Sequence, residues 1–242
     1  VGTTTGVKRE IYYDIPTIFN TGNHFAYFWN GQAQSLESVV QVSIGAENIM
    51  DASWKVILPR LQDDEGTVQR FELAYPDTGL TEANVVDAIA TYTRSLVTPN
   101  AAFDRWLNGE NLSESAQAGY QLFTDYGCIR CHEGAGVGGN MYASFRSYLE
   151  PRNREGTIDF GRFNISNNEA HRYEFKVPSL RNVAVTPPYF HDGSAETLSD
   201  AVDIMARHQL GLELPRSDIS KIVAFLESLT GRVDGVFLGG DQ

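Results

Sequence analysis

Both cysteines of this 242-residue chain lie in one short run, Cys128-Ile129-Arg130-Cys131-His132. Two cysteines that are three positions apart cannot form a framework of disulfides, so the fold must depend on its core. The C-x-x-C-H spacing is instead typical of covalent c-type haem attachment. In that chemistry two thiols add to the porphyrin vinyl groups, and the adjacent histidine places an imidazole beneath the iron.

Two other uses of paired cysteines fit this sequence less well. A thioredoxin-like redox pair usually opens a helix within a βαβ unit, and the sequence lacks that pattern. A zinc ion would need a fourth ligand, and there is no second cysteine pair. Because covalent haem is attached outside the cytoplasm, we expect a periplasmic or comparable extracytoplasmic location.

The iron face opposite His132 has several candidate ligands. They are Met50, Met141, Met205, His24, His171, His191 and His208. Taken singly, each is more simply interpreted as a core or surface residue, and Met205 as packing, because it lies on an amphipathic helix. The residues alone leave the sixth ligand open.

Composition and charge narrow the class of protein. With 42% hydrophobic residues the chain can bury one large core or two small ones, and we expect two compact lobes. A net charge of −12 disfavours nucleic acid and favours basic partners, although a solvated surface explains most of it. No apolar run approaches the roughly 18 residues that cross a bilayer, so we expect no membrane span. The sequence starts at Val1 without a leader, which indicates either a removed signal peptide or a start within a longer protein.

Helical periodicity is weak near the start of the chain and clearer later. We expect the first eighty residues to be mostly loops, with short periodic stretches such as 36–42 and 54–61. Thr81 is predicted to cap a helix whose apolar residues recur at helical spacing until Pro99 ends the pattern. We place a boundary there, between an N-terminal lobe at 1–98 and a C-terminal lobe at 99–242.

Three further helices are predicted in the C-terminal lobe. Ser113 is expected to begin the helix that leads to the cysteine motif. Thr197 is expected to cap a helix over residues 198–209, and Ser217 to begin a last helix with an apolar face. Residues 133–180 carry little periodicity, and we expect a long ordered loop that wraps a large cofactor.

Several segments match a known family in order and spacing. They read SLVTPNAAFDRW at 95–106, GYQLF at 119–123, CIRCH at 128–132, FKVPSLRNV at 175–183, TPPYFHDG at 186–193 and MARHQLG at 205–211. In these segments the chain resembles the bacterial di-haem cytochrome c peroxidases and their MauG-type relatives. The resemblance covers nearly all of the chain. It implies a mostly α-helical fold of two cytochrome-c-like lobes with long ordered loops, of which only the C-terminal lobe carries a haem motif.

The resemblance also implies a set of iron ligands. His132 matches the proximal ligand of the family's electron-transfer haem, and Met205 matches its distal ligand. Thioether ligation raises the potential of an iron relative to two histidines, which suits a site that accepts and passes on electrons. With both axial positions filled, this haem is not expected to bind peroxide.

Two further features follow from the resemblance. A calcium ion between the lobes would be held by the side chain of Asp14 and the main-chain carbonyls of Thr186 and Pro188, with Asp14 in place of the family's usual asparagine. Trp29 matches the tryptophan that lies between the two haems, where it could relay electrons. Its plain alternative is a core aromatic residue.

The chain departs from the family where peroxide chemistry is expected. It has one C-x-x-C-H motif instead of two, so the N-terminal lobe is incomplete. Val39 and a position near Asn48 or Ile49 stand where the peroxidases have glutamine and glutamate, and Gln32 replaces an arginine. An apolar valine cannot transfer a proton, so ordinary peroxidase chemistry is in question.

The sequence is therefore consistent with three functions. The first is a haem c oxidoreductase of this family, to which the chain supplies the electron-transfer haem. The second is a catalytically inactive mono-haem electron-transfer protein or accessory subunit, and the third is a structural haem-stabilised partner. The expected partners are a small redox protein as electron donor, a haem-bearing partner or upstream segment, and a second copy in a homodimer.

Overall fold

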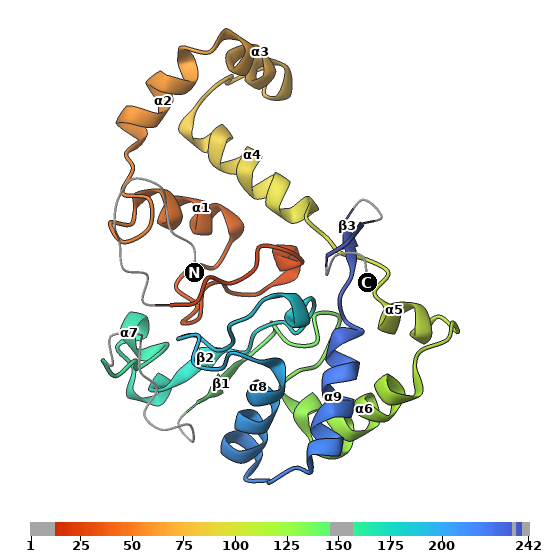
Figure 1. The fold of residues 1–242 in the computed structure, drawn as a ribbon. Helices are drawn as coiled ribbons and strands as arrows, with labels where there is room; N and C mark the ends of the chain where they lie inside the picture. The colour runs from red at the N-terminus through yellow and green to blue at the C-terminus, as the bar shows by residue number, and fades with distance from the viewer. Residues whose placement is uncertain (1–12, 146–156, 234–235, 239–242) are drawn as a thin grey trace.

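Helices make up most of the regular structure in the computed structural model, which describes residues 13–145, 157–233 and 236–238 (Figure 1). The α-helices are α1 (Leu36–Gly45), α2 (Trp54–Gln62), α3 (Glu65–Ala74), α4 (Glu82–Ser95), α5 (Ala102–Leu107), α6 (Glu114–Asp125), α7 (Phe163–Ser166), α8 (Leu198–Met205) and α9 (Arg216–Glu227). Two antiparallel pairs join β1 (Tyr142–Ser144) to β2 (Glu174–Lys176) and β3 (Arg232–Val233) to β4 (Val236–Phe237). Short 3-10 turns are η1 (Thr21–Asn23), η2 (Cys128–Arg130), η3 (Glu169–His171) and η4 (Val183–Val185), and η5 (Ala206–Leu210) is a π-helix. The mostly α-helical class is confirmed.

The first eighty residues are more helical than their sequence pattern predicts. Helices α1, α2 and α3 lie there, and each begins at a polar residue whose side chain accepts a backbone N–H bond, namely Ser35, Ser53 and Asp64. Neither α2 nor α3 buries a residue, and both lie far from α6, α8 and α9 (Figure 1). Helices α1 and α2 coincide with the short periodic stretches at 36–42 and 54–61, whereas α3 has no buried stripe and therefore lacks the periodic signal on which the prediction depends.

Helix α4 confirms the cap at Thr81, whose hydroxyl accepts a hydrogen bond from the backbone of Asn84 at 3.2 Å. Only part of its apolar pattern faces the core. Val85 and Val86 are buried, whereas Tyr92 is 65% exposed. No helix in the described ranges is both long and apolar enough to cross a membrane.

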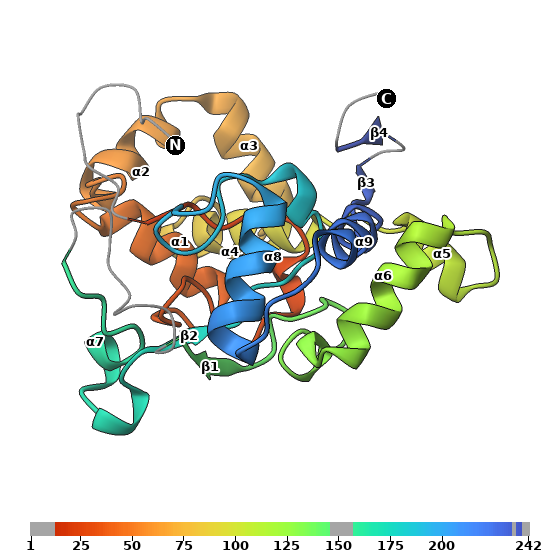
Figure 2. The same cartoon turned by 60° about the horizontal axis from the view of Figure 1, so that its bottom comes forward.

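The main core lies between α6 and α9, which run side by side (Figure 1, Figure 2). Its buried residues are Phe103, Phe123, Val137, Ile222, Phe225, Leu226 and Leu229. Gly119 on α6 faces the backbone of α9, and a Cβ at this position would collide with the carbonyl oxygen of Lys221. Glycine therefore lets the two helices approach closely.

The segment from residue 13 to 34 returns to the C-terminal half of the chain. The backbone N–H of Asp14 donates to the carbonyl of His191 at 2.7 Å, and that of Lys176 donates to the carbonyl of Trp29 at 2.9 Å. The side chain of Asn20 also bonds to Thr98 at 2.7 Å. The contacts of Asp14 and Trp29 join residues on the two sides of residue 98, and the division into lobes at 1–98 and 99–242 stays a prediction.

The close contact of α6 and α9 generates a stability prediction. We expect Gly119→Ala to lower the free energy of unfolding by about 1–3 kcal/mol, because the new methyl group meets backbone that cannot rotate away. Gly45→Ala is the matched control, since a Cβ there has no atom within 4 Å. Denaturant titration followed by circular dichroism measures both variants, and equal stability of the two would contradict the packing argument.

Candidate haem-binding site

The two cysteines lie on a tight turn at the end of α6. Gly127 adopts a positive φ of 89°, which ends the helical segment and starts the 3-10 turn that holds Cys128. Both thiols are free and half-buried, and Cys128 packs against the main core. Burial raises the pKa of the Cys128 thiol to about 11, opposite to the lowered pKa of a reactive redox cysteine. The turn thus presents two free thiols three positions apart, of which that of Cys128 is anchored against the core.

His132 follows the turn and is covered on one side by the glycine-rich loop. Its Nδ1 atom is buried and makes no hydrogen bond of normal geometry in the described structure. A Cβ at Gly138 would lie 3.1 Å from this Nδ1 and would collide with the carbonyl of Pro178, and the φ of Gly138 is +119°. Only glycine therefore allows the loop to close over the ring.

The protonation state of His132 fits a metal ligand. Burial lowers its pKa to about 4, and contacts with the backbone of Val137 and Pro178 only partly oppose the shift. The imidazole is neutral near pH 7, which leaves a lone pair for a metal. The neutral ring, the two thiols and the loop covering Nδ1 together fit a covalently attached haem.

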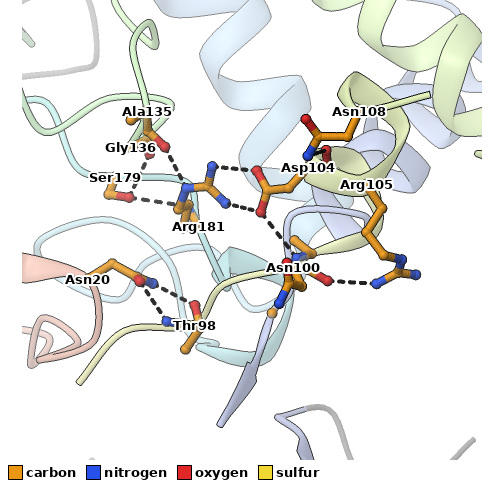
Figure 3. A network of polar contacts seen from close by, with 12 residues as sticks. Asn20, Thr98, Asn100, Asp104, Arg105, Asn108, Ala135, Gly136, Ser179 and Arg181 are labelled. Atoms are coloured by element: carbon orange, nitrogen blue, oxygen red, sulfur yellow. Dashed lines mark hydrogen bonds and ion pairs between the residues drawn. The ribbon is translucent and has the colours of Figure 1, made fainter. Parts of the chain in front are cut away.

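Figure 3 shows the polar contacts that hold this loop. Arg181 forms a bidentate ion pair with Asp104 of α5, with N–O distances of 2.7 and 2.9 Å, and its Nε donates to the carbonyl of Ala135. The hydroxyl of Ser179 donates to the carbonyl of Gly136 at 2.6 Å. The loop that follows His132 is therefore fastened to α5 through the segment after β2.

Met205 is the last residue of α8. The helix changes there to the π-helix η5, which ends at Gly211 with a positive φ of 68°. The predicted helix over 198–209 is thus present, with a wider last turn, and Thr197 caps it as expected. Leu198 and Val202 of α8 pack against the same core as Cys128. The pairing of Met205 with His132 on one iron stays a prediction.

The other candidate ligands have varied surroundings. Met50 is 56% exposed, and the ring of His171 bonds to the hydroxyl of Ser166. His24 has a buried Nε2 beside Gly139. His191 is 3% exposed, with its Nε2 3.9 Å from a carboxylate oxygen of Asp159.

The residues assigned to calcium come from two segments that meet. The bond from Asp14 to the carbonyl of His191 brings Asp14 to the segment that contains Thr186 and Pro188. Trp29 lies beside them, since its indole N–H donates to the carbonyl of Asp14 at 2.8 Å and its ring meets that of His191 edge to face at 6.4 Å. The calcium site and the relay role of Trp29 stay predictions.

The sequence interpretation missed a buried cluster around His191. Its imidazole lies 4.8 Å from the ring of Phe175 and close to Asp159, which is 4% exposed. Burial, together with the charge of Asp159 and a hydrogen bond to it, raises the pKa of Tyr13 above its usual range. Asp159 lies in a stretch without periodicity, so no local pattern marked it.

The sequence was compared with known proteins. It matches the family model for di-haem cytochrome c peroxidase over residues 2–112. It is 39% identical to cytochrome c peroxidase Ccp of Escherichia coli (strain K12), over 89% of this chain and 47% of the relative. It is 31% identical to the methylamine utilization protein MauG of Methylorubrum extorquens, over 95% of this chain and 69% of the relative. This chain belongs to the di-haem cytochrome c peroxidase family.

The family likeness extends to the fold. A crystal structure of a MauG-like protein associated with microbial copper homeostasis superposes with a TM-score of 0.82 at 25% identity, over 91% of this chain and 76% of that chain. Among the sequence relatives, a cytochrome c551 peroxidase of Nitrosomonas europaea is 38% identical over 65% of its own length. This family member thus spans about half to two thirds of the length of the peroxidases it resembles.

The ion pair between Arg181 and Asp104, which holds the loop after His132, leads to a second prediction. We expect Asp104→Asn to lower the free energy of unfolding by about 1–3 kcal/mol, because it leaves Arg181 without its charge partner where the two side chains are only 23% and 17% exposed. The control is Glu110→Gln, which breaks the exposed pair with Arg105 and should cost about 0.5 kcal/mol or less. Amide exchange of the 135–139 loop should accelerate in the first variant alone, and unchanged exchange would refute the clamp.

Proposed function

We propose that this chain supplies the His/Met-ligated electron-transfer haem of a haem c oxidoreductase. Cys128 and Cys131 would form the two thioether bonds to the haem, and His132 and Met205 would be the ligands of its iron. The observation that carries the proposal is the arrangement of two free thiols, one of them packed against the core, and a neutral, loop-covered imidazole just after α6. The haem, when attached, supplies one-electron exchange at the iron.

The protein's own residues define how this haem is held. The α6 to α9 core fixes the thiols, and the loop closed by Gly138 orients the ring of His132. Helix α8 shares this core and carries Met205 at its end. A haem closed on both faces exchanges electrons without binding a small oxidant.

The surroundings of Val39 support electron transfer without peroxide cleavage in this chain. Val39 is half-buried and packs with the core cluster of Tyr27 and Leu36, so it acts as an apolar filler where the peroxidases have an amide. Gln32 is exposed and bonds with its neighbour Asn30. Neither side chain can move a proton between two peroxide oxygens in the way an acid or base does.

A second candidate is a catalytically inactive mono-haem electron-transfer protein or accessory subunit. The replacement of the acid and base positions favours it. The placement of Trp29 against Asp14 and His191 favours the oxidoreductase, because an aromatic ring at this position suits electron transfer to a further haem. That haem would come from a partner or from an upstream segment.

The expected partner and compartment follow from charge and chemistry. A net charge of −12 favours a basic small redox protein as electron donor. Covalent haem attachment places the protein in the periplasm or a comparable compartment. A homodimer of the family type is part of the proposal.

We also propose calcium at Asp14, Thr186 and Pro188. The backbone contact between Asp14 and His191 supports it, because it brings a carboxylate to a loop that offers carbonyl oxygens, the ligands a hard cation prefers. The ion would join the segment from residue 13 to 34 to the loop after η4.

Electron transfer without peroxide turnover is a testable outcome. The haem-loaded chain should reduce and reoxidise reversibly and consume negligible hydrogen peroxide with a reduced cytochrome donor. Met205→Ala should open a coordination position, lower the potential and raise the residual peroxide rate, whereas Met50→Ala, at an exposed methionine, should change none of these. Turnover of roughly 10 per second or more by the unmodified chain would refute the proposal.

Calcium removal gives a separate test. Elemental analysis should find the ion, and chelation should lower the thermal unfolding midpoint without releasing haem, because the ion joins segments and not the cofactor. Asp14→Ala should abolish this shift, whereas Asp14→Asn, which restores the family's usual residue, should keep it. A midpoint that does not respond to chelation, with no metal found, would remove calcium from the account.

A further inference from the structure

Lys176 is a largely buried cation that has no counter-charge among the residues that the structure describes. Its exposed fraction is 7%, and in the described chain no hydrogen bond or ion pair joins its ammonium to another residue. Burial lowers its pKa to about 8, and no carboxylate opposes the shift. A buried ammonium is costly unless an anion pairs with it. The ammonium of Lys176 would therefore be stabilised by an anion that binds next to it.

The neighbours of Lys176 do not supply that anion. His24 is a base, and burial together with the nearby Lys176 lowers its pKa to about 4, so it stays neutral. Glu174, two residues away on β2, pairs with Arg162 at 3.0 Å. Tyr142, the cross-strand partner of Lys176, contacts the guanidinium of Arg162 through its ring. Each flanking group is neutral or already paired.

The position of Lys176 links it to the haem ligand His132. Val177 bonds through its backbone to Gly139 and to Met141, both at 3.0 Å, so the chain continues extended beyond β2 towards Pro178. Alternation along an extended chain places Lys176 and Pro178 on one face, and Phe175 and Val177 on the other. A Cβ at Gly138 would lie 2.2 Å from the carbonyl oxygen of Pro178 and 3.1 Å from Nδ1 of His132, so these two atoms lie on either side of one loop position. The charge of Lys176 acts on His24, whose ring would lie 3.0 Å from a Cβ at Gly139, so Lys176 lies close to the loop that follows His132.

We propose that Lys176 binds a propionate carboxylate of the haem attached at Cys128 and Cys131. The inference rests on the proposed haem attachment and deepens it. The haem brings acidic side chains to a site where the protein has an unpaired cation, and an ammonium-carboxylate bond is among the stronger hydrogen bonds in proteins. The bond keeps the carboxylate ionised and places a positive charge near the iron, which favours the reduced state.

The test compares reduction potentials across pH in the haem-loaded protein. In the unmodified protein the pair stays ionised, so the potential should be flat between about pH 5 and pH 8. In Lys176→Met the carboxylate loses its cation and its pKa rises. The reduction potential of Lys176→Met should then fall as pH increases and the carboxylate ionises. The Lys176→Arg variant keeps the positive charge and should keep the flat profile. Lys55→Met removes the same charge from the exposed surface of α2 and should leave the profile unchanged.

The outcomes separate this inference from the proposed function. Intact mass of each sample shows whether haem is covalently bound, and a wild-type protein without it would overturn the proposed function and this assignment together. With haem present, a Lys176→Met profile identical to the wild type would overturn the propionate contact alone. A wild-type potential that shifts on adding inorganic phosphate, with the shift lost in Lys176→Met, would assign the site to a free anion instead. If Lys176→Met does not retain haem, Lys176→Gln gives the same comparison with a neutral donor.

Discussion

The packing of α6 against α9 is the contact on which the rest of the haem region depends. Gly119 allows the helix backbones to approach, and Phe123 and Phe225 fill the interface with their ring centroids 5.1 Å apart. Helix α6 ends shortly before the cysteine turn, so its docking sets where Cys128 lies. Because protein cores are close-packed, a turn that is anchored in this way is presented rigidly and not as a free loop.

Polar contacts around this core join segments that are distant in sequence. Asn182 is 1% exposed, and its side chain bonds to Thr98 and accepts from the backbone N–H of Gly231. Its neighbour Arg181 reaches α5 and the loop after His132 (Figure 3). Satisfied buried polar groups specify one arrangement, because any other would leave them unpaired. The short segment after β2 therefore joins the loop that follows His132, helix α5 and the chain near residue 98.

The charge distribution differs between the surface and the haem region. The chain as a whole carries −12, whereas the buried titratable groups near the loop are the two neutral imidazoles of His24 and His132 and the cation of Lys176. An acidic exterior steers basic partners towards the protein. A positive charge inside favours a reduced iron and suits the acidic side chains of a haem. Both features agree with the proposed haem and with a small basic protein as its proposed electron donor.

Local patterns were sufficient for part of this account. The C-x-x-C-H spacing, the helix caps at Thr81, Ser113 and Thr197, and the apolar face of α9 could all be predicted, because each depends on residues within a few positions of one another. Helix α3 was missed, because it is held by a cap and buries no apolar face that periodicity could reveal.

The sequence by itself determined the cofactor chemistry, the helical class and the family, because the spacing of cysteines and histidine and the order of motifs are properties of the linear chain. Only the tertiary structure decided that Arg181 holds the loop after His132, that Asp159 faces His191, and that Lys176 is buried with no counter-charge among the described residues. The physical reason is that these contacts join residues far apart in sequence. Their energy depends on burial and on mutual distance, neither of which leaves a periodic trace in the chain.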